Sequence, residues 1–320
     1  MKTNYLMMTL ATGLNFLTLG CAQSSVSADR KLAQTTPEVY VFESGAGGFN
    51  TKTFFYDNGE EVVAFDTQFT GALAQAAIHF LRTKTNHPIT YAVVTHPNPD
   101  KFNGMSVFQK AGAKVIMSSK TASALQTVQE YKEAYFVKVA KMFPEGTYPK
   151  LGTPDQVFEG YQDLRLSSGE VIELSELSSP GVSSNQTVAY IPMIRALMVG
   201  DLVHAKAHAW LEGGIVNGKP VPTLKAWVRD LLEIDQRFAG QSGITLYGGR
   251  GQAGELHTLV REQIAYLNAA NSLVANYAKN LNGANPDYSV LTKQFEERFP
   301  EYQLSYLITY GAYGLFNSML

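Results

Sequence analysis

The sequence predicts one large domain of the α/β class, and three observations support this prediction. Short runs of β-branched and aromatic residues, such as Tyr91 to Val94, are typical of buried strands. Segments with helical periodicity lie between such runs, beginning with 70–83. The chain has 320 residues, of which 45% are hydrophobic, and a chain of this size can bury a large core. We therefore expect alternating strands and helices around one core, with room for an extension.

The first 21 residues have the pattern of a bacterial export signal. Lys2 supplies a positive charge, and the segment from Tyr5 to Gly20 is mostly apolar but too short to span a membrane comfortably. The residues Thr18-Leu19-Gly20-Cys21 resemble a lipobox, in which the cysteine becomes the lipidated first residue of the mature protein. Cys21 is the only cysteine, so an internal disulfide cannot explain it. We expect residues 1–21 to form a signal peptide with a lipobox, and a lipid on Cys21 to anchor the protein to a membrane.

Residues 22–36 are rich in Ser, Ala, Gln and Thr, a composition typical of a flexible tether. Ala22 follows the cysteine where an aspartate would favour the inner membrane, so by analogy with enteric sorting rules it favours the outer membrane. We expect an exported protein at the periplasmic face of the bacterial outer membrane, or one that is soluble in the periplasm. The formal net charge is -2 and Lys/Arg runs are absent, so nucleic acid is not an expected partner.

The next elements begin with a hairpin. Strands are expected at 39–42 and 53–56, on either side of the glycine-rich turn Gly45 to Gly48. No Gly-Lys-Ser/Thr follows this turn, so we interpret it as a plain turn rather than a phosphate loop. The elements expected after it are a helix at 70–83, the strand at 91–94, a helix from 107 to 111 and a strand at 113–117.

A longer helical pattern over 121–142 interrupts this simple alternation and ends at the turn Phe143-Pro144-Glu145-Gly146. Its aromatic residues Tyr131, Tyr135 and Phe136 either line a ligand pocket or pack into the core. An aromatic stripe at helical spacing is more often part of a core, and the sequence does not decide between the two.

Helical patterns also occupy 255–281 and 290–299. The tail 302–320 places aromatic residues mainly at i, i+3 and i, i+4 spacing and has no charged residue after Glu301. An amphipathic helix that packs on the domain explains this pattern. The alternative is a helix that binds a partner or faces a membrane, because so many aromatic side chains are costly to expose.

The loop after the strand at 91–94 carries the most informative motif. It reads T-H-P-N-P-D-K-F-N-G over 95–104 and projects His96, Asn98 and Asp100 from the C-terminal end of a strand, where α/β proteins place their chemistry. The motif resembles the T-H-x-H-x-D-H-x-G-G signature of the metallo-β-lactamase superfamily. Five more segments resemble landmarks of that superfamily and follow in its order: E-V-V-A-F-D-T at 61–67, S-P-G-V-S at 179–183, V-G-D-L-V at 199–203, H-A-W-L at 208–211 and Y-G-G-R-G at 247–251.

This resemblance implies the four-layer αβ/βα sandwich of the superfamily. It covers 37–275, which we expect to be the metallo-β-lactamase-like domain, and leaves 276–320 as a C-terminal helical extension. The alternation of predicted strands and helices agrees with such a sandwich.

The resemblance also implies seven metal-ligand positions, of which three keep a ligand residue: His96, Asp100 and Asp201. Asn98 and Val182 stand in place of two histidines of the first metal, and an amide and an isopropyl group cannot replace imidazoles as zinc ligands. Lys101 and Arg250 stand in place of both histidines of the second metal. We therefore expect no bound metal and no other cofactor.

Three hypotheses describe what Lys101 and Arg250 do. In the favoured one they form an internal salt-bridge cluster with Asp100 and Asp201, because two buried aspartates without a metal would otherwise repel each other. In the second the site has drifted and Lys101 simply reaches solvent. In the third a metal binds to unfamiliar ligands, which His204 and His208 would complete: their i, i+4 spacing would put them on one helical face.

Two functional classes remain. The favoured class is a non-catalytic or repurposed protein that binds a small molecule or a protein partner in a cleft that holds the cluster. The alternative is a hydrolase of an ester, lactone or similar amide-like bond, with one zinc or other divalent metal on His96, Asp100 and Asp201 or a nearby histidine.

In that alternative the metal lowers the pKa of a water molecule and Asp100 acts as the general base. Lys101 and Arg250 would then repel a nearby metal cation, or bind an anionic substrate or an oxyanion.

Overall fold

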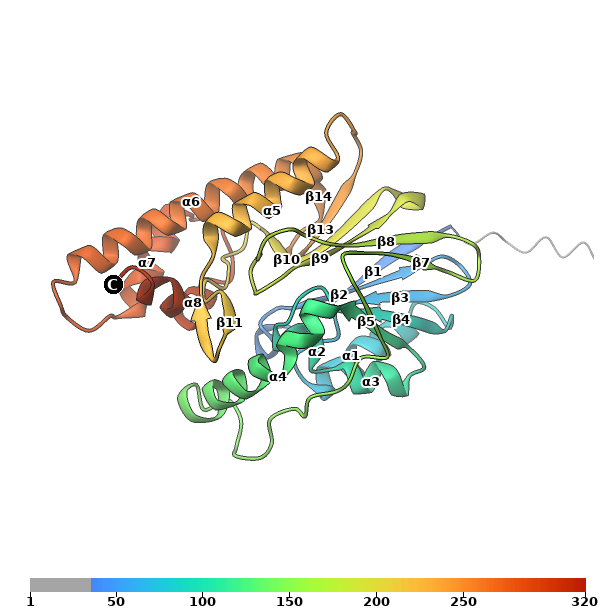
Figure 1. Cartoon of the computed structure of the whole chain (residues 1–320), viewed down its shortest axis with the longest axis horizontal. Helices are drawn as coiled ribbons and strands as arrows, with labels where there is room; N and C mark the ends of the chain where they lie inside the picture. Colours follow the sequence, from blue (N-terminus) through green and yellow to red (C-terminus); the bar gives the residue numbers. More distant parts are fainter. Residues whose placement is uncertain (1–35) are drawn as a thin grey trace, which may run out of the picture. The chain divides into compact units, whose positions relative to one another are not determined.

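The computed structural model describes residues 36–320. These residues form two six-stranded sheets that pack against each other, with helices on the outer face of each (Figure 1). The predicted four-layer αβ/βα sandwich is thereby confirmed. The predicted signal peptide with its lipobox at Cys21 lies outside the described residues, as does nearly all of the predicted tether.

The first sheet has the strand order β1-β2-β3-β4-β5-β6. β1 to β3 are antiparallel neighbours, and β3 to β6 are parallel neighbours. β2 and β3 are buried along their whole length; β3 is apolar throughout, whereas β2 is apolar only from Phe54 to Tyr56. The strands are β1 (Glu38–Glu43), β2 (Lys52–Asp57), β3 (Val62–Phe65), β4 (Ile89–Val93), β5 (Lys114–Ser118) and β6 (Gln156–Phe158).

The second sheet has the order β14-β13-β10-β9-β8-β7, and a separate hairpin pairs β11 with β12. Within this sheet β10 and β13 are parallel and the other neighbours are antiparallel. The strands are β7 (Tyr161–Arg165), β8 (Val171–Glu176), β9 (Thr187–Ile191), β10 (Ala196–Ala205), β11 (Gly214–Val216), β12 (Lys219–Val221), β13 (Thr245–Gly251) and β14 (Gly254–Glu255).

Four helices belong to the half of the chain that contains the first sheet: α1 (Gly71–Arg82), α2 (Pro99–Phe102), α3 (Met105–Lys110) and α4 (Ser119–Ala134). Thr70 caps α1 by accepting a hydrogen bond from the backbone N–H of Leu73, and α1 buries its alanine and leucine face. The helical pattern predicted over 121–142 is not one α-helix. α4 ends at Ala134 and is followed by a π-helical turn, Tyr135–Val139.

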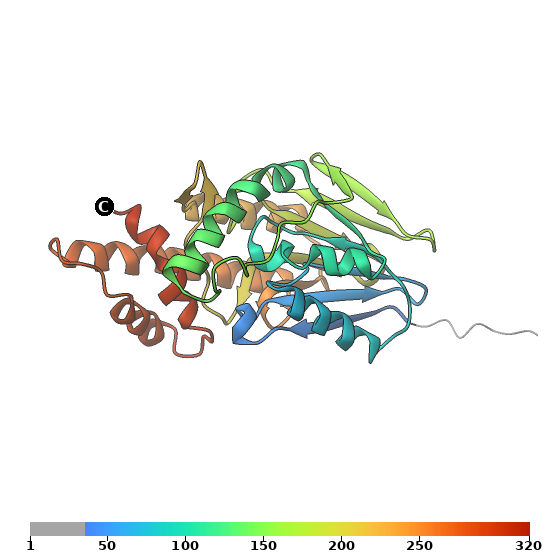
Figure 2. The ribbon, with the colours of Figure 1, turned by 90° about the horizontal axis from the view of Figure 1, so that it is seen from below.

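Four more helices follow in the second half of the chain: α5 (Leu224–Arg237), α6 (Leu256–Asn280), α7 (Tyr288–Arg298) and α8 (Tyr306–Asn317). In Figure 2 the red C-terminal helices gather at one end of the fold, near the green helix α4. Residue 275, where the sequence suggested the end of the core domain, lies inside α6, and the described residues form one compact unit.

Three large apolar clusters occupy the spaces between the layers. One lies between the two sheets and includes Phe65, Val93 and Met198. The other two lie between each sheet and its helices. α8 contributes Ile308 and Leu315 to the cluster on the second sheet, so the tail packs on the fold as one of the two readings of its sequence expected. No helix within residues 36–320 is long and apolar enough to cross a membrane.

Candidate functional site

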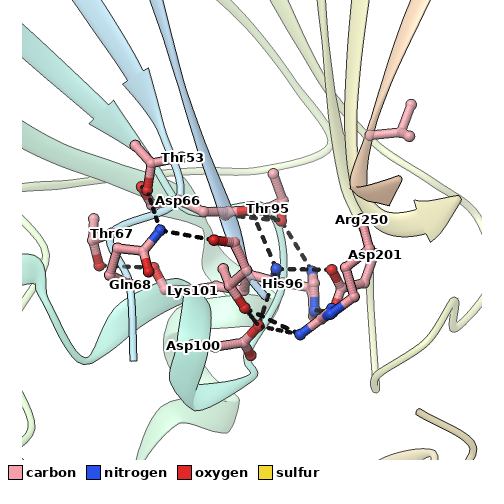
Figure 3. Close-up of polar contacts among 12 residues, drawn as sticks. Thr53, Asp66, Thr67, Gln68, Thr95, His96, Asp100, Lys101, Asp201 and Arg250 are labelled. Atoms are coloured by element: carbon pink, nitrogen blue, oxygen red, sulfur yellow. Dashed lines mark hydrogen bonds and ion pairs between the residues drawn. The ribbon is translucent and has the colours of Figure 1, made fainter. Parts of the chain in front are cut away.

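The site is built from the segment after β4 of the first sheet and from β10 and β13 of the second sheet. His96 follows β4, Asp100 and Lys101 lie in the short helix α2, Asp201 lies on β10 and Arg250 lies on β13 (Figure 3). β10 and β13 are parallel neighbours, so their C-terminal ends lie on the same edge of the second sheet. The structure thus brings together five of the predicted site residues from four separate segments.

Lys101 lies at the centre of a group of carboxylates. Its ammonium nitrogen is 2.8 Å from Oδ1 of Asp201 and 3.1 Å from Oδ2 of Asp100, and it is 3.9 Å from Oδ2 of Asp66. The Lys101 side chain is fully buried. The hypothesis in which Lys101 reaches solvent therefore does not describe this structure.

Arg250 bridges the same two aspartates from the opposite sheet. Nη1 donates to Oδ2 of Asp201 at 2.5 Å, and Nη2 lies 3.1 Å from Oδ2 of Asp100. Nη2 also donates to Oγ1 of Thr51, which in turn donates to Oδ2 of Asp100 at 2.5 Å. Nε donates to the backbone carbonyl of Phe49 at 2.8 Å. Four of the five N–H donors of the guanidinium thus fix this network.

Asp66, at the end of β3, is a member of the site that the sequence analysis did not identify. Its carboxylate accepts hydrogen bonds from the backbone N–H and the hydroxyl of Thr95, and that hydroxyl lies 2.9 Å from Nδ1 of His96. The signal was present, because Asp66 is the aspartate of the segment 61–67 that resembles an early strand of the superfamily. Asp66 thus connects to His96 through the hydroxyl of Thr95 and lies near the ammonium of Lys101.

Burial and charge act against each other throughout this network. Burial alone would raise the pKa of Asp201, but Arg250 and Lys101 hold it well below its usual range. Burial would lower the pKa of Lys101, but Asp100 and Asp201 raise it above its usual value. Asp100 and Asp201 are thus ionised and Lys101 is charged, so with Arg250 the core of the network contains two negative and two positive side chains.

The remaining titratable groups lack such compensation. Burial raises the pKa of Asp66 to about 7, although Lys101 opposes this shift. Burial lowers the pKa of His96 to about 4, so its imidazole is neutral at physiological pH. Nε2 of His96 is 3.8 Å from Oδ2 of Asp201 and has no hydrogen-bond partner within the described part of the chain.

Two glycines allow Asp201 to reach this position. A Cβ on Gly249 would stand 2.0 Å from Oδ1 of Asp201, so only glycine leaves room for the carboxylate. Gly200 has a φ of 52° and lies directly against the Thr95 side chain. The pairing between β10 and β13 is irregular from Met198 to His204, and Asp201 lies in this irregular stretch.

The two histidines proposed to complete a metal site do not share a helical face. His204 lies on β10, and burial lowers its pKa to about 3. His208 follows that strand and is held by the hydroxyl of Tyr266, among aromatic rings that include Phe295 and Tyr302. His208 therefore belongs to the packing of the C-terminal helices and not to the network.

Val182 and Asn98, which stand in place of two metal-binding histidines, lie in different surroundings. Val182 is buried in the apolar cluster on the second sheet. Asn98 precedes α2, makes no side-chain cap to it, and lines a cavity beside the network. The cavity measures about 20 Å³, which is enough for about one water molecule.

Aromatic rings form a second part of the cavity lining, which we call the aromatic wall. Its four members come from four segments that are distant in sequence: Phe49, Phe69, Phe136 and Trp210. Ring centroids of Phe49 and Phe69 are 5.1 Å apart, and those of Phe69 and Phe136 are also 5.1 Å apart. Phe136 thus both lines the cavity and packs against other rings, so the two interpretations of its segment are not exclusive.

A second buried ion pair, between Lys132 and Glu212, stands at the edge of the aromatic wall. The same carboxylate accepts a hydrogen bond from Nε1 of Trp210 at 2.9 Å, and Lys132 also lies over the ring of Trp210. Tyr131 and Tyr135 are turned toward α8, where they bond to Tyr313 and to the carbonyl of Tyr310. The sequence contained no signal for the Lys132–Glu212 pair, because the two residues lie in unrelated segments.

The side chains present do not fit the pair of metal ions implied by the resemblance. Zinc sites need three or four His, Cys, Asp or Glu ligands that converge on one point. No group of three or more such residues is arranged in this way among residues 36–320. The ammonium of Lys101 lies between Asp100 and Asp201, and Arg250 adds a second positive charge that would repel a divalent cation.

Comparisons with known proteins agree with the fold. No protein-family model matches the sequence, and no curated protein matches it. Among solved structures, a metallo-β-lactamase from Pontibacter korlensis is 21% identical with a TM-score of 0.51, over 68% of this chain and 87% of that one. The DIM-1 metallo-β-lactamase is 15% identical with a TM-score of 0.54, over 74% of this chain and 95% of that one. The chain therefore has the metallo-β-lactamase fold, and at these identities the likeness concerns the fold alone.

Proposed function

We propose that this protein is an exported, non-catalytic binding protein with a metallo-β-lactamase fold. In it, a buried ion-pair network takes the place of the metal ions. The observation that carries the proposal is the position of Lys101, whose ammonium is 2.8 Å from Asp201 and 3.1 Å from Asp100. A side chain of this chain supplies the positive charge that a metal ion would otherwise supply to these carboxylates.

The network also makes Asp100 a weak base for the activation of water. Asp100 is the general base of the alternative hydrolase, and one of its oxygens, Oδ2, contacts Thr51, Lys101 and Arg250. Burial would raise the pKa of Asp100, but the positive charges, that of Lys101 above all, hold this pKa below its usual value. Such a carboxylate is a poor proton acceptor near neutral pH. His96 is neutral but fully buried beneath the network.

The alternative remains a hydrolase with one metal on His96, Asp100 and Asp201. Its support is Nε2 of His96, which is buried near Asp201 without a hydrogen-bond partner in residues 36–320. Lys101 would have to leave its present position before a metal could approach both aspartates.

Elemental analysis of protein purified without chelator separates the two functions. The proposal predicts substoichiometric zinc, iron and manganese, and no shift of the melting temperature when these ions are added. One or more tightly held metal ions per chain would contradict the proposal and favour the hydrolase.

For the cellular location we propose export and attachment of a lipid to Cys21, supported by the lipobox-like sequence before this lone cysteine. Labelling cells with a tagged fatty acid should mark the wild-type protein, and Cys21→Ser should abolish the label and release the protein from membranes. An unlabelled wild-type protein, with a Cys21→Ser variant that stays on membranes, would contradict this proposal and would point to α8 as the membrane contact.

A further inference from the structure

The cavity beside the network has a polar floor and an aromatic wall. Asp100, Asp201 and Arg250 line the floor together with Asn98, and the four rings of Phe49, Phe69, Phe136 and Trp210 line the wall. The rings of the wall meet mainly edge to face: the planes of Phe49 and Phe69 are at 64°, those of Phe69 and Phe136 at 63°, and those of Phe49 and Trp210 at 76°. Such rings can bind an aromatic molecule through face and edge contacts. The aromatic wall would therefore contact the apolar ring of a ligand, and the floor would bind its polar group.

Every charge at this cavity is already neutralised by a partner. Arg250 pairs with both aspartates, Asp201 also pairs with Lys101, and Lys132 pairs with Glu212. All of these side chains are at least nine-tenths buried. A charged ligand would therefore find no free charge of opposite sign in the cavity, and burying an unpaired ion is costly. The site thus disfavours both anions and cations.

Asp100 and Asn98 on the floor keep hydrogen-bonding capacity. The contacts made to Asp100 fall on Oδ2, which leaves Oδ1 able to accept a hydrogen bond. Asn98 lines the cavity, and its amide, which makes no cap to α2, can both donate and accept. A ligand with an N–H or O–H donor would match these two groups.

We propose that this cavity binds an uncharged, flat molecule that carries a hydrogen-bond donor, such as a carboxamide or a phenol. The inference rests on the proposed binding function and specifies its ligand class. It differs from a metal-centred site, where charge on the ligand would be an advantage.

The aromatic wall must open to admit such a molecule, because the cavity now holds about one water. Phe49 and Asn50 have φ values of 59° and 51°, a conformation that is unfavourable for a bulky residue such as phenylalanine. Their turn is held by Arg250, through the carbonyl of Phe49, and by Tyr306 of α8, whose hydroxyl donates to Asn50. Asn50 also donates to Glu43, and Phe49 packs against Phe69, Phe136, Trp210 and Tyr310, so opening the wall requires these contacts to loosen together with the two bonds.

Three probes of nearly the same shape test the inference: benzamide, which is neutral, benzoate, which is an anion, and benzamidinium, which is a cation. Calorimetric titration of the purified protein should show a Kd for benzamide at least tenfold below that of either ion. Asn98→Ala should weaken benzamide binding about tenfold, whereas the matched change Asn271→Ala, at an exposed position of α6, should leave it unchanged. If Asn98→Ala does not fold, Asn98→Ser provides the same comparison.

Binding of either ion as tightly as benzamide, or no binding of any probe, would overturn the inference. Benzamide binding that is insensitive to both Asn98 variants would also overturn it, because the ligand would then lie elsewhere. Metal content is measured separately, so a metal-free protein that binds no probe rejects the ligand class alone. A metal-loaded protein rejects the proposed function itself.

Discussion

Arg250 on β13 donates to Asp201 on the neighbouring strand β10 at 2.5 Å, and both side chains are almost fully buried. Removing one partner of such a pair leaves a buried charge without compensation, which typically costs roughly 3 to 5 kcal/mol. Arg250→Ala should therefore lower the free energy of unfolding by about this amount, as measured by urea denaturation. Arg165→Ala is the matched control, because the Arg165–Asp163 pair is on the surface and such pairs contribute roughly 0 to 1 kcal/mol.

The same pair should show energetic coupling. Arg250→Ala leaves Asp100 and Asp201 with only Lys101 as a buried cation. Asp201→Asn removes the excess negative charge, so the double variant should recover part of the lost stability. A double-mutant cycle at one pH measures this coupling. If Arg250→Ala lowers the free energy of unfolding no more than Arg165→Ala does, and its effect adds independently to that of Asp201→Asn, the network does not stabilise the fold.

Restoring histidines tests whether Lys101 occupies the place of a metal. Arg250→His alone should give no zinc-dependent stabilisation, because the Lys101 ammonium still lies between Asp100 and Asp201. Lys101→His combined with Arg250→His should give a melting temperature that rises with zinc. A zinc-dependent rise in the single variant Arg250→His would instead indicate that a metal can bind beside Lys101.

Asp66 should make stability depend on pH. Burial raises its pKa from 3.8 to about 7 in the folded protein, so the folded state binds this proton more tightly than the unfolded state. The stabilising contribution is fully present below about pH 4 and is lost as the pH rises toward 7. Asp66→Asn resembles the protonated side chain at every pH, so the variant should gain stability relative to wild type between pH 5 and pH 8. Parallel pH profiles of the two proteins would contradict this assignment.

The contact between α8 and the site predicts an unusual response to a glycine substitution. Gly to Ala within a helix ordinarily stabilises by roughly 0.4 to 1 kcal/mol. A Cβ on Gly314 of α8 would stand 2.3 Å from the backbone oxygen of Glu212, so Gly314→Ala should destabilise, by about 1 to 3 kcal/mol. Gly71→Ala in α1 is the control, because its Cβ would meet Val107 at an ordinary 3.6 Å. Equal effects of both substitutions on thermal unfolding would show that α8 does not press on Glu212.

Much of the fold could be predicted from the sequence, because its determinants are local. The strand before His96 is apolar and β-branched, and Asp201 follows a similar run, so each residue could be assigned to the end of a strand. Motif order then placed Lys101 and Arg250 near Asp100 and Asp201, and the structure brings these four side chains together. Parallel pairing of β10 and β13 accounts for Asp201 beside Arg250. Asp100 and Lys101 follow β4 of the other sheet, so their meeting with this pair was implied by the resemblance and depends on how the two sheets pack.

The tertiary structure alone decided which other side chains complete the site. Lys132 meets Glu212, and Tyr306 meets Asn50, across long stretches of chain with no shared periodicity. Similarly, the spacing of His204 and His208 suggested a common helical face, but His204 lies on a strand and His208 packs among the C-terminal aromatic rings. Local sequence specifies the type of an element and which of its faces is apolar. The side chains that meet across elements depend on how whole helices and sheets pack, and no short segment contains that information.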